Sequence, residues 1–345
     1  MQIKTMMTGC AALALLAGAA AAEARTQIRI VGSSTVYPFT TAVAEQFKRS
    51  YPQFQAPIVE STGTGGGIKL FCSGVGEQFP DFANASRRIK ASEVKACQAN
   101  GVTGIVEVQI GLDGLTIAQA RNGQFKNLTE LDVYKALAAT PFGRPNTYKT
   151  WKQVNSSLPD VKIEVLGPPP TSGTRDAFND LYMIKGCETN LAMPALKKSD
   201  EPKYKLICTK LREDGAFVEA GENDNLIVQK IAANPNSLGV FGYSYLEENG
   251  DKIKDVPING VTATYETIAS FKYPASRPLY IYAKAQHMKA VRGMKEFLAE
   301  YTKESTWGKG GYLAKRGLVA SPDAVRAKNA QVASASTLLD AATVK

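Results

Sequence analysis

The chain has 345 residues, 44% hydrophobic and 21% charged, which excludes a disordered or fibrous protein and suits one large domain or two medium ones. Lysine and arginine exceed aspartate and glutamate by nine (41 − 32), but the basic residues are scattered and form no stripe interleaved with aromatic residues. The charge therefore permits an anionic ligand, and we expect no binding to nucleic acid.

Residues 1–24 have the pattern of a secretory signal peptide. Lys4 supplies the positive charge, Ala11–Ala22 (AALALLAGAAAA) is a short apolar run, and the tripeptide that ends at Ala24 offers a small-x-small cleavage site. The apolar run is too short to span a membrane as a mature helix. We therefore expect cleavage near Ala24 and a periplasmic mature protein.

Short β-like runs alternate with helix-like runs along the mature chain, which predicts an α/β fold. The first part contains three strand–helix pairs, which we expect at Gln27–Val31 and Val36–Lys48, Ala56–Glu60 and Gly67–Ser73, and Asp81–Ala85 and Ser92–Ala99, the last helix starting at its serine. The second part repeats the alternation, with strands at Val161–Leu166 and Leu238–Phe241 and helices at Leu128–Ala139, Thr174–Ile184, Asn225–Ala233 and Gly242–Glu248.

The remaining segments carry weaker patterns. Residues 186–222 look irregular and polar, and helices are expected at Met288–Tyr301 and near Thr306–Arg316. The tail after Pro322 is rich in alanine and serine, which predicts a loosely attached helix or coil.

Two long β-like runs, Ile105–Ala118 and Pro278–Ala285, are suited to cross between lobes. They predict a discontinuous first lobe of residues 25–113 plus 278–345 and a continuous second lobe of residues 114–277. Small ligands bind in clefts between α/β lobes, outside the carboxyl ends of strands. A ligand cleft between the two lobes is therefore expected.

Four cysteines remain once the signal segment is removed, an even number in an oxidising compartment. Of three connectivities we favour Cys72–Cys97 and Cys187–Cys208, because each pair closes a loop of moderate size within one lobe. Two or more free buried thiols are the alternative. Zinc is disfavoured, because no CxxC pair occurs and His287 is the only histidine.

Three strand-to-helix junctions combine hydroxyl side chains with glycines: Val31–Phe39 (VGSSTVYPF), Glu60–Lys69 (ESTGTGGGIK) and Gly167–Phe178 (GPPPTSGTRDAF). At such a junction the unpaired N–H groups and the helix dipole favour an anion. Ordinary helix capping, as by Thr171 and its neighbours, explains any single junction. Three junctions in one chain point to a ligand with several anionic oxygens.

Two arginines accompany these junctions. Arg87 ends the segment Asp81–Arg87 (DFANASR), and Arg175 directly follows the Ser-Gly-Thr cap of the third junction. A guanidinium matches two oxygens of a tetrahedral anion. A solvated surface role is the alternative for each arginine, but beside the caps both become candidate ligands.

Signatures of catalysis are weak. The chain has no G-x-S-x-G elbow, and its glycines at 63–67 do not fit the dinucleotide fingerprint. His287 has no motif around it, which predicts a surface residue. We therefore expect neither an enzyme nor a cofactor.

The motifs GSSTVYP, STGTGGGIK, DFANASR, TSGTRDAF and NPNSLGVFGYSYL, in this order, resemble the exported phosphate-binding proteins of high-affinity phosphate ABC importers. The likeness covers essentially the whole mature chain. It implies the type II periplasmic binding protein fold, capture of inorganic phosphate, and delivery to a membrane permease. We expect a monomer. The alternatives are a binder of another tetrahedral oxyanion, such as sulfate, and an exported phosphatase-like hydrolase.

The resemblance also implies a ligand set of hydroxyl and backbone groups. Matched by motif, it comprises Ser34, Thr35, Val36, Thr64, Ser172, Gly173 and Thr174. Well-known members of this family carry an aspartate at the position of Arg87. They also carry an arginine and an aspartate at the positions where this chain has Pro168 and Pro170.

From these departures we infer that Arg87 and Arg175 supply the positive charge. Asp113 is then a candidate for the group that accepts the proton of hydrogen phosphate and rejects sulfate. Asn225, near the start of another helix, is a candidate extra ligand.

Overall fold

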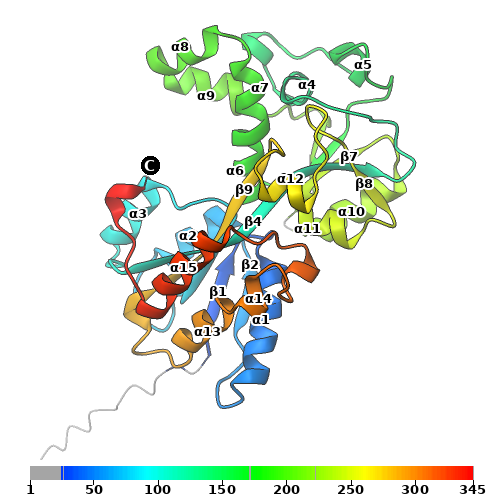
Figure 1. The fold of residues 1–345 in the computed structure, drawn as a ribbon. Coiled ribbons are helices and arrows are strands. Elements are labelled where there is room, and N and C mark those ends of the chain that lie inside the picture. The colour runs from blue at the N-terminus through cyan, green and yellow to red at the C-terminus, as the bar shows by residue number, and fades with distance from the viewer. Residues whose placement is uncertain (1–24, 26, 171, 222, 345) are drawn as a thin grey trace, which may run out of the picture.

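One nine-stranded mixed sheet runs through both lobes of the protein (Figure 1). The structure is a computed structural model that describes residues 25, 27–170, 172–221 and 223–344. The predicted signal peptide and Thr171 lie outside the described residues. Among the described residues, none of the helices has the length and apolar character needed to cross a membrane.

The strands are β1 (Arg29–Gly32), β2 (Ile58–Ser61), β3 (Phe82–Ala85), β4 (Ile105–Ala120), β5 (Val165–Gly167), β6 (Phe217–Glu219), β7 (Leu238–Gly242), β8 (Ile253–Asp255) and β9 (Ser276–Lys284). Their order in the sheet is β2-β1-β3-β9-β4-β7-β5-β6, with β8 also paired to β4. The strands β1, β2 and β3 pair in parallel, as do β5, β6 and β7.

The two predicted crossovers are adjacent antiparallel strands. β4 pairs with β9 through its first part and with β7 and β8 through its second part. We name the part of the protein that contains β1–β3 lobe A, and the part that contains β5–β8 lobe B. Both β4 and β9 pass between the lobes (Figure 1), which confirms the predicted two-lobed α/β fold.

Helices cover the sheet in both lobes. Those of lobe A are α1 (Tyr37–Ser50), α2 (Thr64–Phe71), α3 (Ala91–Ala99), α13 (Met294–Tyr301), α14 (Glu304–Trp307) and α15 (Asp323–Ala335). Those of lobe B are α4 (Glu130–Leu137), α5 (Trp151–Val154), α6 (Gly173–Phe178), α7 (Ile184–Glu188), α8 (Ala192–Ser199), α9 (Glu201–Thr209), α10 (Asp224–Ala233), α11 (Tyr243–Glu248) and α12 (Tyr265–Ala269).

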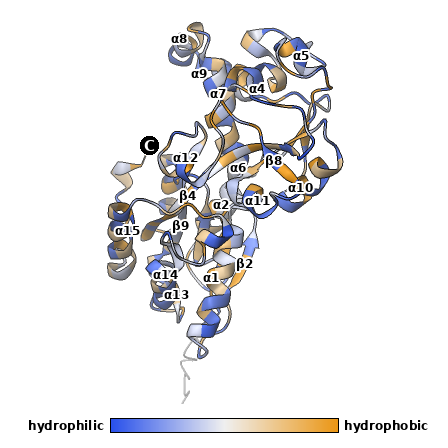
Figure 2. Cartoon of the chain, turned by 45° about the vertical axis from the view of Figure 1, so that its right-hand side comes forward, coloured by the Kyte–Doolittle hydropathy of each residue, from blue (hydrophilic) through white to orange (hydrophobic). Residues whose placement is uncertain are grey.

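Lobe A buries apolar residues on both faces of its sheet. Phe82 packs in the cluster that includes Phe39 and Phe297, whereas its neighbour Ala83 packs with Phe71. Successive strand residues point to opposite faces, so one short strand serves both clusters. Helix α1 mixes hydrophobic and hydrophilic residues along its length (Figure 2) and buries the former.

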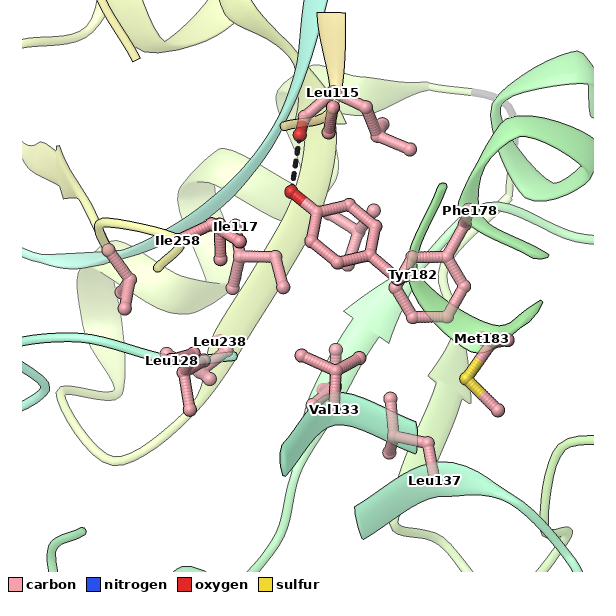
Figure 3. Packing of buried hydrophobic residues seen from close by; sticks show 14 of the residues in the cluster. Leu115, Ile117, Leu128, Val133, Leu137, Phe178, Tyr182, Met183, Leu238 and Ile258 are labelled. Atoms are coloured by element: carbon pink, nitrogen blue, oxygen red, sulfur yellow. Dashed lines mark hydrogen bonds between the residues drawn. The ribbon is translucent and has the colours of Figure 1, made fainter. Parts of the chain in front are cut away.

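Lobe B has one large core, to which α4, the segment after α6, and β4 contribute (Figure 3). The hydroxyl of Tyr182 lies in this core and donates to the Leu115 carbonyl on β4 at 2.7 Å (Figure 3). The core is therefore tied to the crossover strand by a polar contact as well as by packing.

Both predicted disulfides are confirmed. Cys72–Cys97 lies in lobe A and Cys187–Cys208 in lobe B. Each links two helical segments of its own lobe, so neither bond restricts movement of one lobe against the other.

The prediction that residues 186–222 are irregular is wrong, because they contain the end of α7, α8, α9 and β6. Few side chains of α8 and α9 are buried, among them Met193 and Tyr204, which leaves a weak apolar pattern in these two helices. Pro194 and Pro202 resemble helix breakers, but both lie in the first turn of a helix, where the backbone N–H has no intrahelical partner.

The prediction of a loosely attached tail is also wrong. In α15, the guanidinium of Arg326 binds Glu304, and Asn329 Oδ1 accepts the Gln109 N–H of β4 at 2.7 Å. Further along, the Leu339 N–H donates to the Ile105 carbonyl at 2.7 Å. The tail is therefore anchored by polar contacts, which an apolar pattern does not reveal.

Several helix boundaries differ from the predictions. Helix α3 is capped by Lys90 rather than Ser92, because the Glu93 carboxylate accepts the Lys90 N–H at 2.8 Å. Helix α13 starts only at Met294, after Gly293 with a φ of 91°. The helix expected near Thr306–Arg316 is split into α14 and a short 3₁₀ turn.

The prediction of a surface position for His287 is wrong, since this side chain is buried. Its Nδ1 lies 2.7 Å from Asp81 Oδ1, and its Nε2 accepts the Gly76 N–H at 3.0 Å. Asp81 also binds the Arg25 guanidinium. The histidine is thus part of a buried polar cluster within lobe A.

Gly186 of α7 provides a test of how tightly lobe B is packed. A Cβ at this position would lie 2.2 Å from the Glu130 carbonyl oxygen of α4. Helix propensity alone favours Gly186→Ala by about 1 kcal/mol. We expect instead that overpacking lowers the free energy of unfolding by about 1–3 kcal/mol, measured by urea denaturation.

Gly310→Ala is the matched control, because a Cβ there meets nothing within 4 Å. It should change the free energy of unfolding by less than about 0.5 kcal/mol. A stabilised Gly186→Ala protein would contradict the packing of α7 on α4.

Candidate functional site

Two of the three predicted junctions meet between the lobes. Thr35 lies between β1 and α1 in lobe A, and Thr174 lies in the first turn of α6 in lobe B. Their hydroxyl oxygens are 2.8 Å apart, and both side chains are fully buried. A hydrogen bond between the lobes therefore joins segments that the sequence had singled out separately.

A buried ion pair adjoins this contact. Arg277 of β9 and Asp113 of β4 are register partners in the sheet, with Nη2 2.9 Å and Nε 3.0 Å from Asp113 Oδ2. Arg277 Nη2 also donates to Thr35 Oγ1 at 3.1 Å. The side chains of Arg277 and Asp113 are only 5% and 2% exposed, so a desolvated positive charge lies at the junction of the lobes.

Asp113 also accepts a hydrogen bond from a residue of lobe B. Its Oδ1 accepts the backbone N–H of Tyr243, the first residue of α11, at 2.9 Å. Burial raises the pKa of Asp113, while Arg277 and the Tyr243 N–H act against that rise. The carboxylate therefore connects β4, β9 and α11 at one point.

Gly242, at the end of β7, packs closely against this junction. A Cβ at Gly242 would lie 2.9 Å from Thr35 Cγ2 and 3.1 Å from Asp113 Oδ1. Its φ of −69° is ordinary, so the close surroundings rather than the backbone conformation require glycine. The side chains of both lobes thus converge on a point with no room for a methyl group.

Two buried hydroxyl groups belong to residues that adjoin the junction in sequence, Ser34 before Thr35 and Ser244 after Tyr243. Ser34 Oγ and Ser244 Oγ are buried and have no hydrogen-bond partner within the described part of the chain. A buried hydroxyl without a partner is unfavourable unless a ligand or water satisfies it. Ser34 was predicted as a ligand, whereas Ser244, on the motif NPNSLGVFGYSYL, was not.

The remaining predicted groups lie at helix starts. Thr64 is the first residue of α2, with its hydroxyl 3.1 Å from Ser86 Oγ, and Ser172 caps α6 by accepting the Thr174 N–H at 3.1 Å. The Val36 N–H donates to Ser33 Oγ at 3.3 Å, and Gly173 is the first residue of α6. Each is therefore placed at a helix N-terminus, as predicted.

Close backbone packing brings α2 to β1. A Cβ on Gly67 would lie 2.4 Å from the Gly32 Cα, so both positions need glycine. Helix α2 starts at Thr64, three residues before the predicted Gly67.

Arg87 and Arg175 are bound to carboxylates. Arg87 Nε lies 2.8 Å from Asp176 Oδ2, and Arg175 Nη2 lies 2.8 Å from Glu219 Oε1. Arg175 also lies 4.4 Å above the centre of the Phe217 ring. Asn225, the candidate extra ligand, is exposed on α10.

Arg277 is the charged residue that the sequence predictions missed. It immediately precedes the run Pro278–Ala285, one residue outside the predicted strand. The sequence feature that could have identified Arg277 is an arginine placed directly before an apolar crossover strand. Only the pairing of β9 with β4 places it beside Asp113.

This fold and site define a two-lobed binding protein with a hydroxyl-rich junction between its lobes. A family model described as "PBP superfamily domain" matches residues 17–305. Protein SphX of Synechococcus elongatus is 33% identical over 278 residues, which cover 78% of this chain and 71% of the relative.

Phosphate-binding protein PstS of Staphylococcus epidermidis is 32% identical over 300 residues, covering 84% of this chain and 78% of the relative. A crystal structure titled "a possible phosphate binding protein" from Planctomyces limnophilus superposes with a TM-score of 0.58 at 30% identity, covering 90% of this chain and 98% of the other. The chain therefore belongs to the PstS family of phosphate-binding proteins within the PBP superfamily. The resemblance inferred from the motifs is confirmed.

The Asp113–Arg277 pair gives a prediction for stability. Asp113→Asn leaves the Arg277 guanidinium buried without its counter-charge, which should lower the free energy of unfolding by about 3–5 kcal/mol in urea denaturation. Glu201→Gln removes a carboxylate from an exposed pair with Lys205, 2.7 Å apart, and should leave the free energy of unfolding nearly unchanged. Equal effects of the two substitutions would contradict the burial of the Asp113–Arg277 pair.

Proposed function

We propose that this protein binds inorganic phosphate between its lobes and delivers it to the permease of an ABC importer. The observation that carries the proposal is the convergence of Thr35, Thr174 and the Arg277–Asp113 pair at the lobe junction. Hydroxyls and helix N-termini donate hydrogen bonds to anionic oxygens, and a buried guanidinium offsets their charge. The relatives described above are named as phosphate-binding proteins, which supports phosphate as the anion.

The proposed ligand set retains the hydroxyl and backbone groups predicted from the sequence. It comprises Ser34, Thr35, Val36, Thr64, Ser172, Gly173 and Thr174. We add Arg277 as the cation, because its guanidinium already donates to Thr35. Arg87 and Arg175, which the sequence suggested as ligands, are left out of this proposed set, since each is bound to a carboxylate in the structure.

Asp113 is the proposed basis for selection between anions. A carboxylate accepts a hydrogen bond from the P–OH group of hydrogen phosphate, whereas fully ionised sulfate has no proton to donate. Facing sulfate, the carboxylate and anion would present only lone pairs to each other, which is costly in a buried site. Asp113 is buried and already placed beside the Arg277–Thr35 contact.

The proposed function also includes a domain division, a cellular location and an oligomeric state. We propose the division into residues 25–113 plus 278–345 and 114–277, since the lobe B core draws on residues 112–275 and, beyond them, only on Val319. We also propose export with cleavage near Ala24, a periplasmic monomer that docks on its permease, and no catalytic activity.

Calorimetry with phosphate and sulfate tests the function. From about pH 5 to pH 8, the range in which a phosphate group gains its second charge, phosphate should bind and sulfate should bind at least ~100-fold more weakly. Wild-type protein and Asp113→Asn are titrated side by side, and the substitution should reduce the discrimination. Equal affinity for both anions in the wild-type protein would refute the assignment to phosphate.

Substitution of the arginines tests the source of the positive charge. Arg277→Gln should weaken phosphate binding by about 2–5 kcal/mol, because it removes a buried cation and leaves Asp113 unpaired. Arg175→Gln should weaken phosphate binding by less than about 1 kcal/mol. Arg175 is bound to Glu219, whose side chain is 51% exposed, rather than to the residues at the lobe junction. A large loss in Arg175→Gln, with unfolding unchanged, would instead place Arg175 on the anion.

A further inference from the structure

A second polar contact joins the two lobes, beside the proposed phosphate site. Arg87 follows β3 in lobe A, and Asp176 belongs to α6 in lobe B. Arg87 Nε donates to Asp176 Oδ2 at 2.8 Å, with side chains that are 12% and 28% exposed. The pair therefore lies partly shielded from solvent at the boundary between the lobes.

The Arg87 guanidinium is held in place from lobe A. Its two terminal nitrogens donate to Glu93 at 2.9 and 2.8 Å, and Nη1 also donates to the Arg88 carbonyl at 3.1 Å. Because Glu93 already restricts the side chain, little rotational freedom remains to be lost when Asp176 approaches. Lys90 places a second cation 3.6 Å from Asp176.

The partner carboxylate is attached to the proposed phosphate site. Asp176 lies two residues after Thr174 in the same helix, α6, whose first turn contributes to the ligand set. A movement that carries α6 away from lobe A would break both the Thr35–Thr174 contact and the Arg87–Asp176 pair. The Arg87–Glu93 contacts would survive, because both residues belong to lobe A.

We propose that Arg87 and Asp176 form a latch that stabilises the closed arrangement of the lobes and thereby sets how long phosphate is retained. This inference rests on the proposed function. An interaction present only in the closed arrangement raises its population, and the apparent affinity of a ligand that needs that arrangement rises in proportion. Arg87 then acts as a positioning residue, through Asp176 rather than through the anion.

The latch and direct contact with the anion predict opposite roles for Asp176. If Arg87 bound phosphate itself, Asp176 would compete for the guanidinium and add a negative charge near the anion. Asp176→Asn would then leave phosphate binding unchanged or make it tighter. If the pair is a latch, Asp176→Asn weakens binding, because the closed arrangement loses its ion pair.

The test compares Arg87→Gln, Asp176→Asn, the double substitution and the wild-type mature protein. Release of radiolabelled phosphate into excess unlabelled phosphate gives the dissociation rate, and calorimetry gives the affinity. Each single substitution should raise the dissociation rate and Kd about three- to tenfold, as for a partly exposed ion pair. The double substitution should match Asp176→Asn, because that change already removes the interaction with Arg87 together with the longer contact to Lys90. Glu201→Gln, in an exposed pair on α9, is the control and should match the wild type.

Two results would overturn the latch: weaker binding in Arg87→Gln without any loss in Asp176→Asn, or unchanged release in both. Small-angle X-ray scattering without ligand adds a measurement that does not depend on phosphate. The radius of gyration should be larger in Asp176→Asn than in Glu201→Gln, and equal values also count against the latch. A wild-type protein that binds no phosphate would refute the proposed function, while scattering still tests the latch.

Discussion

The register between β4 and β9 is the constraint on which the site depends. Asp113 and Arg277 are paired residues in two antiparallel strands that both lobes share. Because successive strand residues point to opposite faces, a shift of one residue would separate the two charges. Two charges buried without each other would be strongly unfavourable, so the pair and the register support one another. Thr35 then contacts Arg277 from lobe A.

The lobes meet through short polar contacts, while each keeps its own apolar core. Thr35 bonds Thr174, and Arg87 bonds Asp176, whereas the large cores lie within the lobes. Apolar packing is rigid and close, but a few hydrogen bonds and ion pairs contribute only a modest free energy each. Such a boundary suits a protein whose lobes close on a small anion and open again.

Local patterns predicted much of the fold. The strands near Gln27–Val31 and Asp81–Ala85 and the crossover Ile105–Ala118 lie within two residues of β1, β3 and β4. The prediction failed at α8 and α9, where few side chains are buried, and in the tail, where Asn329 and Arg326 supply polar anchors. Periodicity reports burial of apolar side chains, so it misses segments held by other means.

The sequence by itself determined the three hydroxyl-rich helix starts, the two crossovers and the pairing of cysteines within each lobe. These are local features, since a cap, a strand or a short loop depends on neighbouring residues. Tertiary structure alone decided the partners of the charges: Arg277 with Asp113 beside Thr35, Arg87 with Asp176, and His287 with Asp81. Each pair joins residues at least 89 positions apart, and no local pattern specifies which distant charge a folded chain will bring within reach.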